Sequence, residues 1–300
     1  MNQDMKLGIV GLDTSHVIAF TRILNDTNDP NHVPGASVVA AYPSFSKDIE
    51  TSYSRVEGYT RELRDQWGLE IVESVEALCE RVDAVLLESN DGRRHLTEFK
   101  PVAASGKPCF IDKPLAASVA DAKKIAELAR DSGTRVFSSS SLRFVSEIES
   151  VIKDADTIGE IEQVHVFSPA PQEPTNPGLF WYGVHGVEML YTLMGPGCEK
   201  VTCFPSENGE ILVGSWREGR RATLAATRLS THDYGAVVHG SKGSRAFVCQ
   251  IGALYVPLIR EIVAFFRGAE PPVPIETTVE IMAFMEAALN SNEKQVKLSC

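Results

Sequence analysis

The sequence predicts an α/β protein: a doubly wound parallel sheet followed by an α+β domain with an open antiparallel sheet. Up to about residue 140, short apolar segments alternate with helical segments, which is typical of a parallel sheet with right-handed crossovers. Beyond that point strand-like segments follow one another directly, separated by turns that contain glycine. We therefore expect two domains, residues 1–140 and residues 141–300.

The first domain is expected to begin with a strand at 6–11 and a helix at 15–25 that carries Val17, Phe20 and Leu24. Further strands are expected at 36–42, 82–89, 107–112 and 135–140, and further helices at 59–68, 72–80, 93–106 and 118–133. The last of these helices has Ser118 as a candidate N-cap and Gly133 as a candidate C-cap.

The second domain is expected to open with a helix at 145–153, a proline-rich loop at 168–178 and a helix at 180–194. Strand-like segments then read KVTCFP, EILVGSWR, RATLAATRLS, YGAVVHGS and SRAFVCQ. The turns between them favour a meandering antiparallel sheet. Helices at 256–267 and 277–290 follow.

Composition narrows the function classes. The chain has 300 residues, of which 43% are hydrophobic and 23% charged, and its net charge is −11. This charge disfavours nucleic acid or an anionic membrane as the main partner, and no apolar run approaches the roughly 20 residues of a membrane helix. The six cysteines form no CxxC pair, which favours reduced thiols and a cytoplasmic protein.

The segment KLGIVGLDTSH (residues 6–16) places a glycine-ended strand before a helix, as Rossmann-type dinucleotide-binding domains do. Counted from Gly11, however, the second and third glycines of GxGxxG are replaced by Asp13 and His16. A carboxylate there would repel a pyrophosphate by roughly 1 to 4 kcal/mol at about 4 Å.

Two interpretations of this loop remain open. Asp13, Thr14 and Ser15 are good N-cap residues, and Asp13 would then satisfy the first N–H groups of the helix. Alternatively, Asp13 and His16 belong to an active site at the carboxyl end of the strand. We find no ligand spacing that indicates a metal at Asp13, His16 and His95.

Several later segments, in order, resemble the glucose–fructose oxidoreductase / inositol dehydrogenase / MocA (Gfo/Idh/MocA) family. They are SNDGRRHLTEFKPVAASG, GKPCFIDKPLA, SSLRFVSEIESVIKDADTIGEIEQV and WYGVHGVEMLYTLMGPG. The resemblance implies a Rossmann-like dinucleotide-binding domain and a substrate and oligomerisation domain. It further implies an oxidoreductase that uses NAD or NADP on the CH–OH group of a small sugar- or polyol-like substrate, and a homo-oligomer formed through the second-domain sheet.

The resemblance implies that Lys113 and His185 are the catalytic residues. A histidine suits acceptance of the hydroxyl proton, and a lysine can hold the developing oxyanion or tune the histidine; we expect Asp112 to position Lys113. The residues expected to bind the cofactor are Gly8, Gly11, Asp13, Thr14, Ser15, His16, Ser89, Asn90 and His95. Those expected near the substrate are Arg143, Trp181, Tyr182 and Glu188.

The chain also departs from the family pattern. The strand at 36–42 is followed by Ser44, Ser46 and Lys47 instead of an acidic residue for the ribose, which suits either a 2′-phosphate or a plain polar loop. Trp181 stands where the family often has an aspartate, and it would stack on a sugar ring or fill the core. The alternative function is therefore a cofactor-independent lyase, hydrolase or isomerase, or a ligand-binding regulator, on the same fold.

Overall fold

A computed structural model describes residues 4–300, which form two compact units. The first unit contains the chain up to Ala116, then Ala120–Ser139 and Tyr255–Ile275; the second contains Ala117–Val119, Ser140–Leu254 and Glu276–Cys300. Near residue 140 the chain passes from the first unit into the second. The segment Tyr255–Ile275 differs from expectation, because it packs with the first unit although the sequence places it in the second domain.

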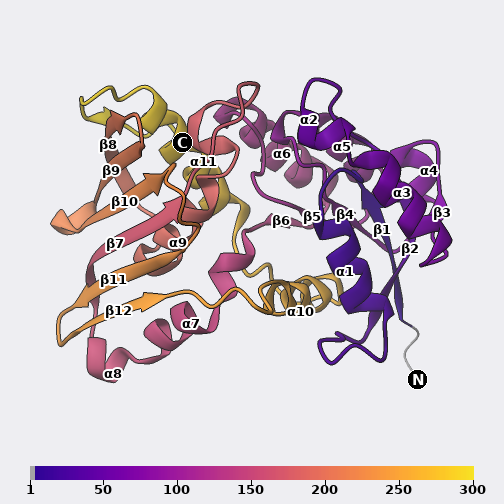
Figure 1. The fold of residues 1–300 in the computed structure, drawn as a ribbon, viewed down its shortest axis with the longest axis horizontal. Coiled ribbons are helices and arrows are strands. Elements are labelled where there is room, and N and C mark those ends of the chain that lie inside the picture. Colours follow the sequence, from indigo (N-terminus) through magenta and orange to yellow (C-terminus); the bar gives the residue numbers. More distant parts are fainter. Residues whose placement is uncertain (1–3) are drawn as a thin grey trace. The chain divides into compact units, whose positions relative to one another are not determined.

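The first unit contains a six-stranded parallel sheet with the strand order β3-β2-β1-β4-β5-β6, which is the doubly wound Rossmann order (Figure 1). Its strands are β1 (Met5–Val10), β2 (Ala36–Tyr42), β3 (Glu70–Ile71), β4 (Ala84–Leu87), β5 (Cys109–Ile111) and β6 (Val136–Ser138). Every residue of β4, β5 and β6 is buried, as expected for strands of a parallel sheet that helices cover on both faces.

Helices accompany this sheet: α1 (His16–Asn25), α2 (Glu50–Tyr53), α3 (Val56–Asp65), α4 (Val75–Cys79), α5 (Gly92–Ser105), α6 (Val119–Ser132) and α10 (Tyr255–Phe266). Helix α10 packs against α1 (Figure 1). Its Phe265 ring lies 4.8 Å from the ring of Phe137, which in turn lies 5.1 Å from Phe110. This aromatic row explains why a segment so late in the chain belongs to the first unit.

The second unit contains a seven-stranded sheet with the order β12-β11-β7-β10-β9-β8-β13. Its strands are β7 (Ile161–Pro169), β8 (Cys198–Ser206), β9 (Gly209–Trp216), β10 (Arg221–Thr227), β11 (Gly235–Gly240), β12 (Ser244–Val248) and β13 (Val296–Lys297). Its helices are α7 (Ser146–Lys153), α8 (Ala155–Ile158), α9 (Val184–Met194) and α11 (Ile275–Leu289), with 3-10 turns at Ser141–Phe144, Gly178–Phe180 and Arg217–Gly219.

The expectation of a wholly antiparallel sheet is wrong at one pair, because β7 and β10 run parallel. The chain leaves β7 through the proline-rich loop and α9 before it forms the β8–β9 hairpin. It then enters β10 in the same direction as β7, while β11 pairs antiparallel on the other side of β7.

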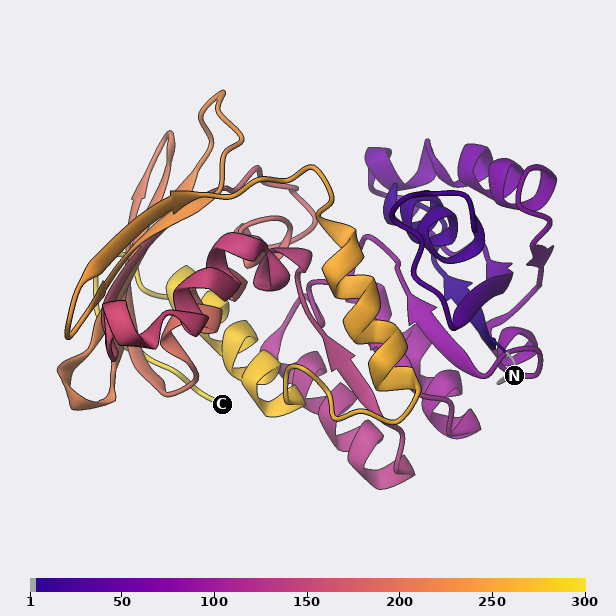
Figure 2. The same ribbon diagram turned by 90° about the horizontal axis from the view of Figure 1, so that it is seen from below.

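Helices cover one face of this sheet and leave the other open (Figure 2). Burial alternates along β7 and β10, as this arrangement requires. Val164, Val166 and Leu224 are buried, whereas His165 and Thr223 are half-buried. The open antiparallel face expected from the sequence is therefore present, apart from the parallel pair.

Two further expectations concern covalent and membrane features. No disulfide joins any two of the six cysteines, all of which lie within the described range. In residues 4–300 we find no helix with the length and apolar character needed to cross a bilayer.

Candidate functional site

The turn after β1 requires glycine. Gly11 has a φ of +88°, and a Cβ there would lie 2.3 Å from Ser89 Oγ and 2.4 Å from the Ser89 backbone nitrogen. At Gly8, inside β1, a Cβ would meet the Leu78 side chain at 2.8 Å. Both glycines therefore allow neighbouring segments to approach β1 closely.

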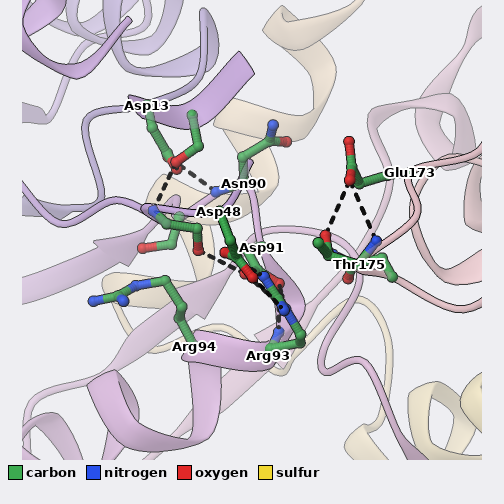
Figure 3. A network of polar contacts seen from close by, with 12 residues as sticks. Asp13, Asp48, Asn90, Asp91, Arg93, Arg94, Glu173 and Thr175 are labelled. Atoms are coloured by element: carbon green, nitrogen blue, oxygen red, sulfur yellow. Dashed lines mark hydrogen bonds and ion pairs between the residues drawn. The ribbon is translucent and has the colours of Figure 1, made fainter. Parts of the chain in front are cut away.

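Asp13 points into the first unit and is fully buried. Its carboxylate accepts hydrogen bonds from Ser52 Oγ at 2.6 Å and from the Asn90 backbone N–H at 3.0 Å (Figure 3). Burial raises the pKa of Asp13, and these two hydrogen bonds act in the opposite direction. Asp13 thus ties the loop after β1 to the loop after β4.

The N-cap interpretation of Asp13 is therefore wrong. Helix α1 begins at His16, and its N-cap Ser15 makes no side-chain capping hydrogen bond. The hydroxyl of Thr14 accepts from the His16 N–H at 3.4 Å. The Asp13 carboxylate instead finds its donors on α2 and on the loop after β4, because it is directed away from the start of α1.

Hydrogen bonds of His95 and Ser89 hold the loops at the carboxyl edge of the sheet in place. The fully buried imidazole of His95 has Nε2 2.7 Å from the Ser89 carbonyl and Nδ1 2.9 Å from the Pro114 carbonyl. Ser89 Oγ donates to Glu98 at 2.6 Å. His95 therefore fixes the segment that directly follows Lys113.

His16, Glu88 and Asp112 meet at the ends of β1, β4 and β5. His16 Nδ1 lies 2.7 Å from Asp112 Oδ2 and 3.8 Å from Glu88 Oε2. Burial disfavours the charged imidazole, but the charge and hydrogen bond of Asp112, together with the nearby Glu88 carboxylate, outweigh burial and raise the pKa of His16 to about 9. Burial raises the pKa of Glu88, whereas His16 and Lys113 hold the pKa of Asp112 below its usual range despite burial.

Lys113 follows Asp112 at the carboxyl end of β5 and is only 7% exposed. Its positive charge favours the ionised forms of both Asp112 and Glu88. The positioning of Lys113 by Asp112 stays a prediction, and His16 is a second cationic neighbour of Asp112 that the sequence did not indicate.

A cleft of about 500 Å³ lies beside the end of β2. Arg93 in this cleft is held by Asp91 and by Asp48, at 2.7 Å and 2.8 Å (Figure 3). Arg94 bonds Glu98 at 2.8 Å and Ser44 at 2.7 Å. The remaining lining residues are Tyr42, Pro43, Phe45, Ser46 and Lys47.

In the second unit, α9 carries His185, which is 8% exposed. Its Nδ1 lies 2.7 Å from Ser140 Oγ, and the ring of Tyr182 meets its ring edge-on at 5.0 Å. The Tyr234 hydroxyl donates to the Tyr182 hydroxyl at 2.8 Å. The histidine is therefore oriented by a hydroxyl and flanked by aromatic rings.

Arg143 and Glu188, both expected near a substrate, bind each other. Arg143 donates two hydrogen bonds to Glu188 Oε2, at 2.8 Å and 2.6 Å. Burial raises the pKa of Glu188, and the Arg143 charge opposes that effect. Trp181, just before α9, is half-buried.

The sequence did not single out Glu88, Ser140 or Tyr234. Glu88 had a usable signal, because a glutamate directly follows the wholly apolar strand β4. Ser140 and Tyr234 had none, since their contacts with the α9 region join residues 45 and 52 positions apart.

The strand order and the glycine-ended turn after β1 define a Rossmann-type unit, which is the fold of many dinucleotide-binding domains. Residues 6–140 match the profile of a family described as the oxidoreductase family with an NAD-binding Rossmann fold, Gfo/Idh/MocA. The first unit is therefore similar in sequence to that family.

The known proteins of similar sequence or fold include inositol dehydrogenases. Inositol 2-dehydrogenase of Cereibacter sphaeroides is 26% identical over 181 residues, which are 59% of this chain and 48% of the relative. The chain thus spans about half the length of the curated relatives it matches.

Two solved structures share the fold. A putative myo-inositol dehydrogenase from Sinorhizobium meliloti superposes with a TM-score of 0.80 and 18% identity, covering 98% of this chain and 100% of that one. The scyllo-inositol dehydrogenase of Lactobacillus casei, solved with NAD(H) and scyllo-inositol, gives a TM-score of 0.79 and 15% identity, with 98% and 99% covered.

Proposed function

We propose that the protein is an NAD(P)-dependent oxidoreductase that acts on a hydroxyl-bearing carbon of a small sugar- or polyol-like substrate. The observation that carries this proposal is Lys113, a largely buried lysine at the carboxyl end of β5. In doubly wound sheets, ligands bind at this edge. The similar inositol dehydrogenases support the substrate class.

The residues of the first unit fit a dinucleotide. The turn at Gly11 keeps the backbone close to Ser89, and the Asp13 carboxylate is turned inward, so its charge is not presented at the surface of the loop. The cleft beside β2 lies where such domains hold the adenosine ribose. A bound nicotinamide would supply the hydride acceptor or donor.

We infer that NADP is preferred over NAD. No acidic residue stands in Pro43–Lys47 after β2, and Ser44 and Arg94 lie together in the cleft. An arginine at this position accommodates a 2′-phosphate. The carboxylate of Asp48 already forms an ion pair with Arg93, so we do not expect it to bind the ribose hydroxyls of NAD.

We propose that His185 and Lys113 carry out two separate tasks in the reaction. With Nδ1 held by Ser140, His185 would take the substrate hydroxyl proton at Nε2. Lys113 would hold the developing oxyanion. Ser140 and the Tyr182–Tyr234 pair fix the ring of His185 and limit the rotamers it can adopt.

Titration with NADPH and NADH, followed by nicotinamide fluorescence, tests the proposal. We expect saturable binding in the micromolar range. With NADP⁺ or NAD⁺ supplied instead, we expect reduction of the cofactor, followed by absorbance, with one or more members of a panel of inositols, sugars and sugar acids. Absence of binding at millimolar cofactor would reject the proposal and favour a cofactor-independent enzyme or a ligand-binding regulator on this fold.

We also propose that the open sheet face joins copies of this chain into a homo-oligomer. Phe204 and Ile211, paired across β8 and β9, are 44% and 48% exposed. Exposed apolar pairs of this kind are typical of association surfaces. Ile211→Glu should lower the mass measured by light scattering, whereas Ile152→Glu, on α7, should not.

A further inference from the structure

Three metal-binding side chains converge in the first unit: His16 from α1, Glu88 after β4 and Asp112 after β5. One ligand atom from each, an imidazole nitrogen or a carboxylate oxygen, lies within 4.8 Å of the others. We call these residues the His16–Glu88–Asp112 cluster. They are 72 and 24 residues apart in sequence, so the sheet topology alone brings them together.

Glu88 has no hydrogen-bond partner that explains its burial. Its side chain is fully buried, and neither carboxylate oxygen accepts a hydrogen bond within residues 4–300. Its ion-pair contact, with His16 Nδ1, is 3.8 Å long. A buried carboxylate without hydrogen bonds is costly, and such groups are normally paired or coordinate a metal.

The spacing of the cluster suits a cation at its centre. Bonds of about 2.0 to 2.2 Å to nitrogen and oxygen in tetrahedral geometry place neighbouring ligand atoms about 3.3 to 3.6 Å apart. The distances from His16 Nδ1 to Asp112 and Glu88, 2.7 Å and 3.8 Å, lie on either side of that range. A shift of a few tenths of an ångström in each side chain would equalise them.

The charge of the cluster also suits a divalent ion. Coordination needs the neutral imidazole, so a bound ion would replace the proton that His16 carries beside Asp112. The ion would then face two carboxylates and one neutral imidazole, with the positive charge of Lys113 nearby. The ring of Tyr255 covers one edge of His16 at 4.9 Å, while the His16 side chain keeps 15% exposure, which provides a route for entry.

We propose that the His16–Glu88–Asp112 cluster binds one divalent transition-metal ion, such as Zn²⁺ or Mn²⁺. Mixed imidazole and carboxylate donors suit these ions, and three protein ligands leave a coordination position for a water or a ligand oxygen. The site lies at the sheet edge where doubly wound proteins bind ligands. It does not depend on the proposed oxidoreductase activity.

Calorimetric titration of the full chain, freed of metal by chelator and dialysis, with ZnCl₂ and separately with MnCl₂ tests this site. We expect one ion per chain with a micromolar or lower Kd. Glu88→Gln and His16→Gln should each weaken binding by at least tenfold, a loss typical of damaged metal sites. Addition of the ion should also raise the Tm of the wild type and not that of the variants.

His165→Gln is the matched control, because the half-buried rings of His165 and His239 lie 5.7 Å apart on the second-unit sheet and can themselves attract zinc. This variant should retain the high-affinity site. Circular dichroism and Tm in chelator show whether each variant is folded.

A wild type that binds neither ion below millimolar concentration would overturn the proposal, whatever the behaviour of the variants. So would tight binding that His165→Gln abolishes. Because these readouts need neither NAD(P)H nor a substrate, failure of the oxidoreductase proposal would leave them unaffected.

Discussion

Individual acidic side chains decide how much charge the carboxyl edge of the Rossmann sheet presents. Asp13 lies where a pyrophosphate would be repelled, yet its carboxylate is buried and hydrogen-bonded to Ser52 and Asn90. The sequence places the carboxylate in the loop but does not determine which way it faces. The partners that turn it inward come from segments 39 and 77 residues away.

Replacement of His185 tests the catalytic role at the residue scale. His185→Ala should lower kcat by at least about 100-fold, because general-base contributions are commonly 10² to 10⁴. The Kd for NADPH should stay within about twofold of the wild-type value, as measured by fluorescence titration. Turnover that survives the substitution would remove His185 from the mechanism.

Arg94→Gln tests the cofactor preference. If the guanidinium holds a 2′-phosphate, its loss should weaken NADPH binding by about tenfold, roughly the 1.4 kcal/mol of one charge-assisted hydrogen bond. NADH binding should barely change, so the ratio of the two Kd values is the readout. Equal losses for both cofactors would instead indicate a general structural effect.

Asp91 should make stability depend on acid pH. Burial acts to raise the pKa of Asp91, but hydrogen bonds from Arg93 and Ser46 outweigh it, and the pKa is lowered in the folded state. Its stabilisation is therefore present above the unfolded pKa of about 3.9 and is lost as pH falls through the folded value.

Asp91→Asn retains a cap for α5 but removes the charge, so at pH 7 it should lower the free energy of unfolding by about 1 kcal/mol. The difference from wild type, measured by urea unfolding at several pH values, should shrink below about pH 4. A constant difference across that range would contradict the assignment.

At the scale of elements, the sequence is most informative where a residue type is tied to a local conformation. The strand at 36–42 and the glycines that end the helices of the first unit are found as expected, because periodicity and positive φ are local properties. Strand pairing is not local. The parallel β7–β10 pair joins residues 58 positions apart, and no feature of either strand specifies the other.

Gly11→Ala tests the tight turn after β1. The substitution combines a positive φ with a clash against the Ser89 backbone, so it should cost about 2 to 5 kcal/mol in urea unfolding. Gly68→Ala is the matched control, because Gly68 has a similar φ of +70° and nothing within 4 Å of an added Cβ. That variant should lose only about 1 kcal/mol.

At the scale of the whole molecule, the sequence pattern predicted the two sheets and singled out Lys113, just after β5, and His185, on α9. What it did not reveal is that helix α10 belongs to the first unit. The apolar pattern of an amphipathic helix predicts that one face is buried, but it does not predict which hydrophobic core that face joins. The same limit hid the His16–Glu88–Asp112 cluster, whose members come from three separate elements.

Phe265→Ala tests the place of α10. Phe265 is 1% exposed, its carbonyl accepts from Arg135 at 2.9 Å, and the Arg135 guanidinium lies 4.5 Å from its ring centroid. Truncation of a buried phenylalanine usually costs about 3 to 5 kcal/mol. Urea unfolding should show a loss of this size, and a change below about 1 kcal/mol would mean that α10 is dispensable.

The return of α10 also sets an order of events during synthesis. Synthesis runs from the amino end, so Tyr255–Ile275 emerges only after Ser140–Leu254 of the second unit has been made. Until then Phe265 is not available to cover Phe137, while most strands of the second unit are already available to pair. Completion of the first unit therefore follows synthesis of most of the second unit, although the strands of the first unit are made earlier.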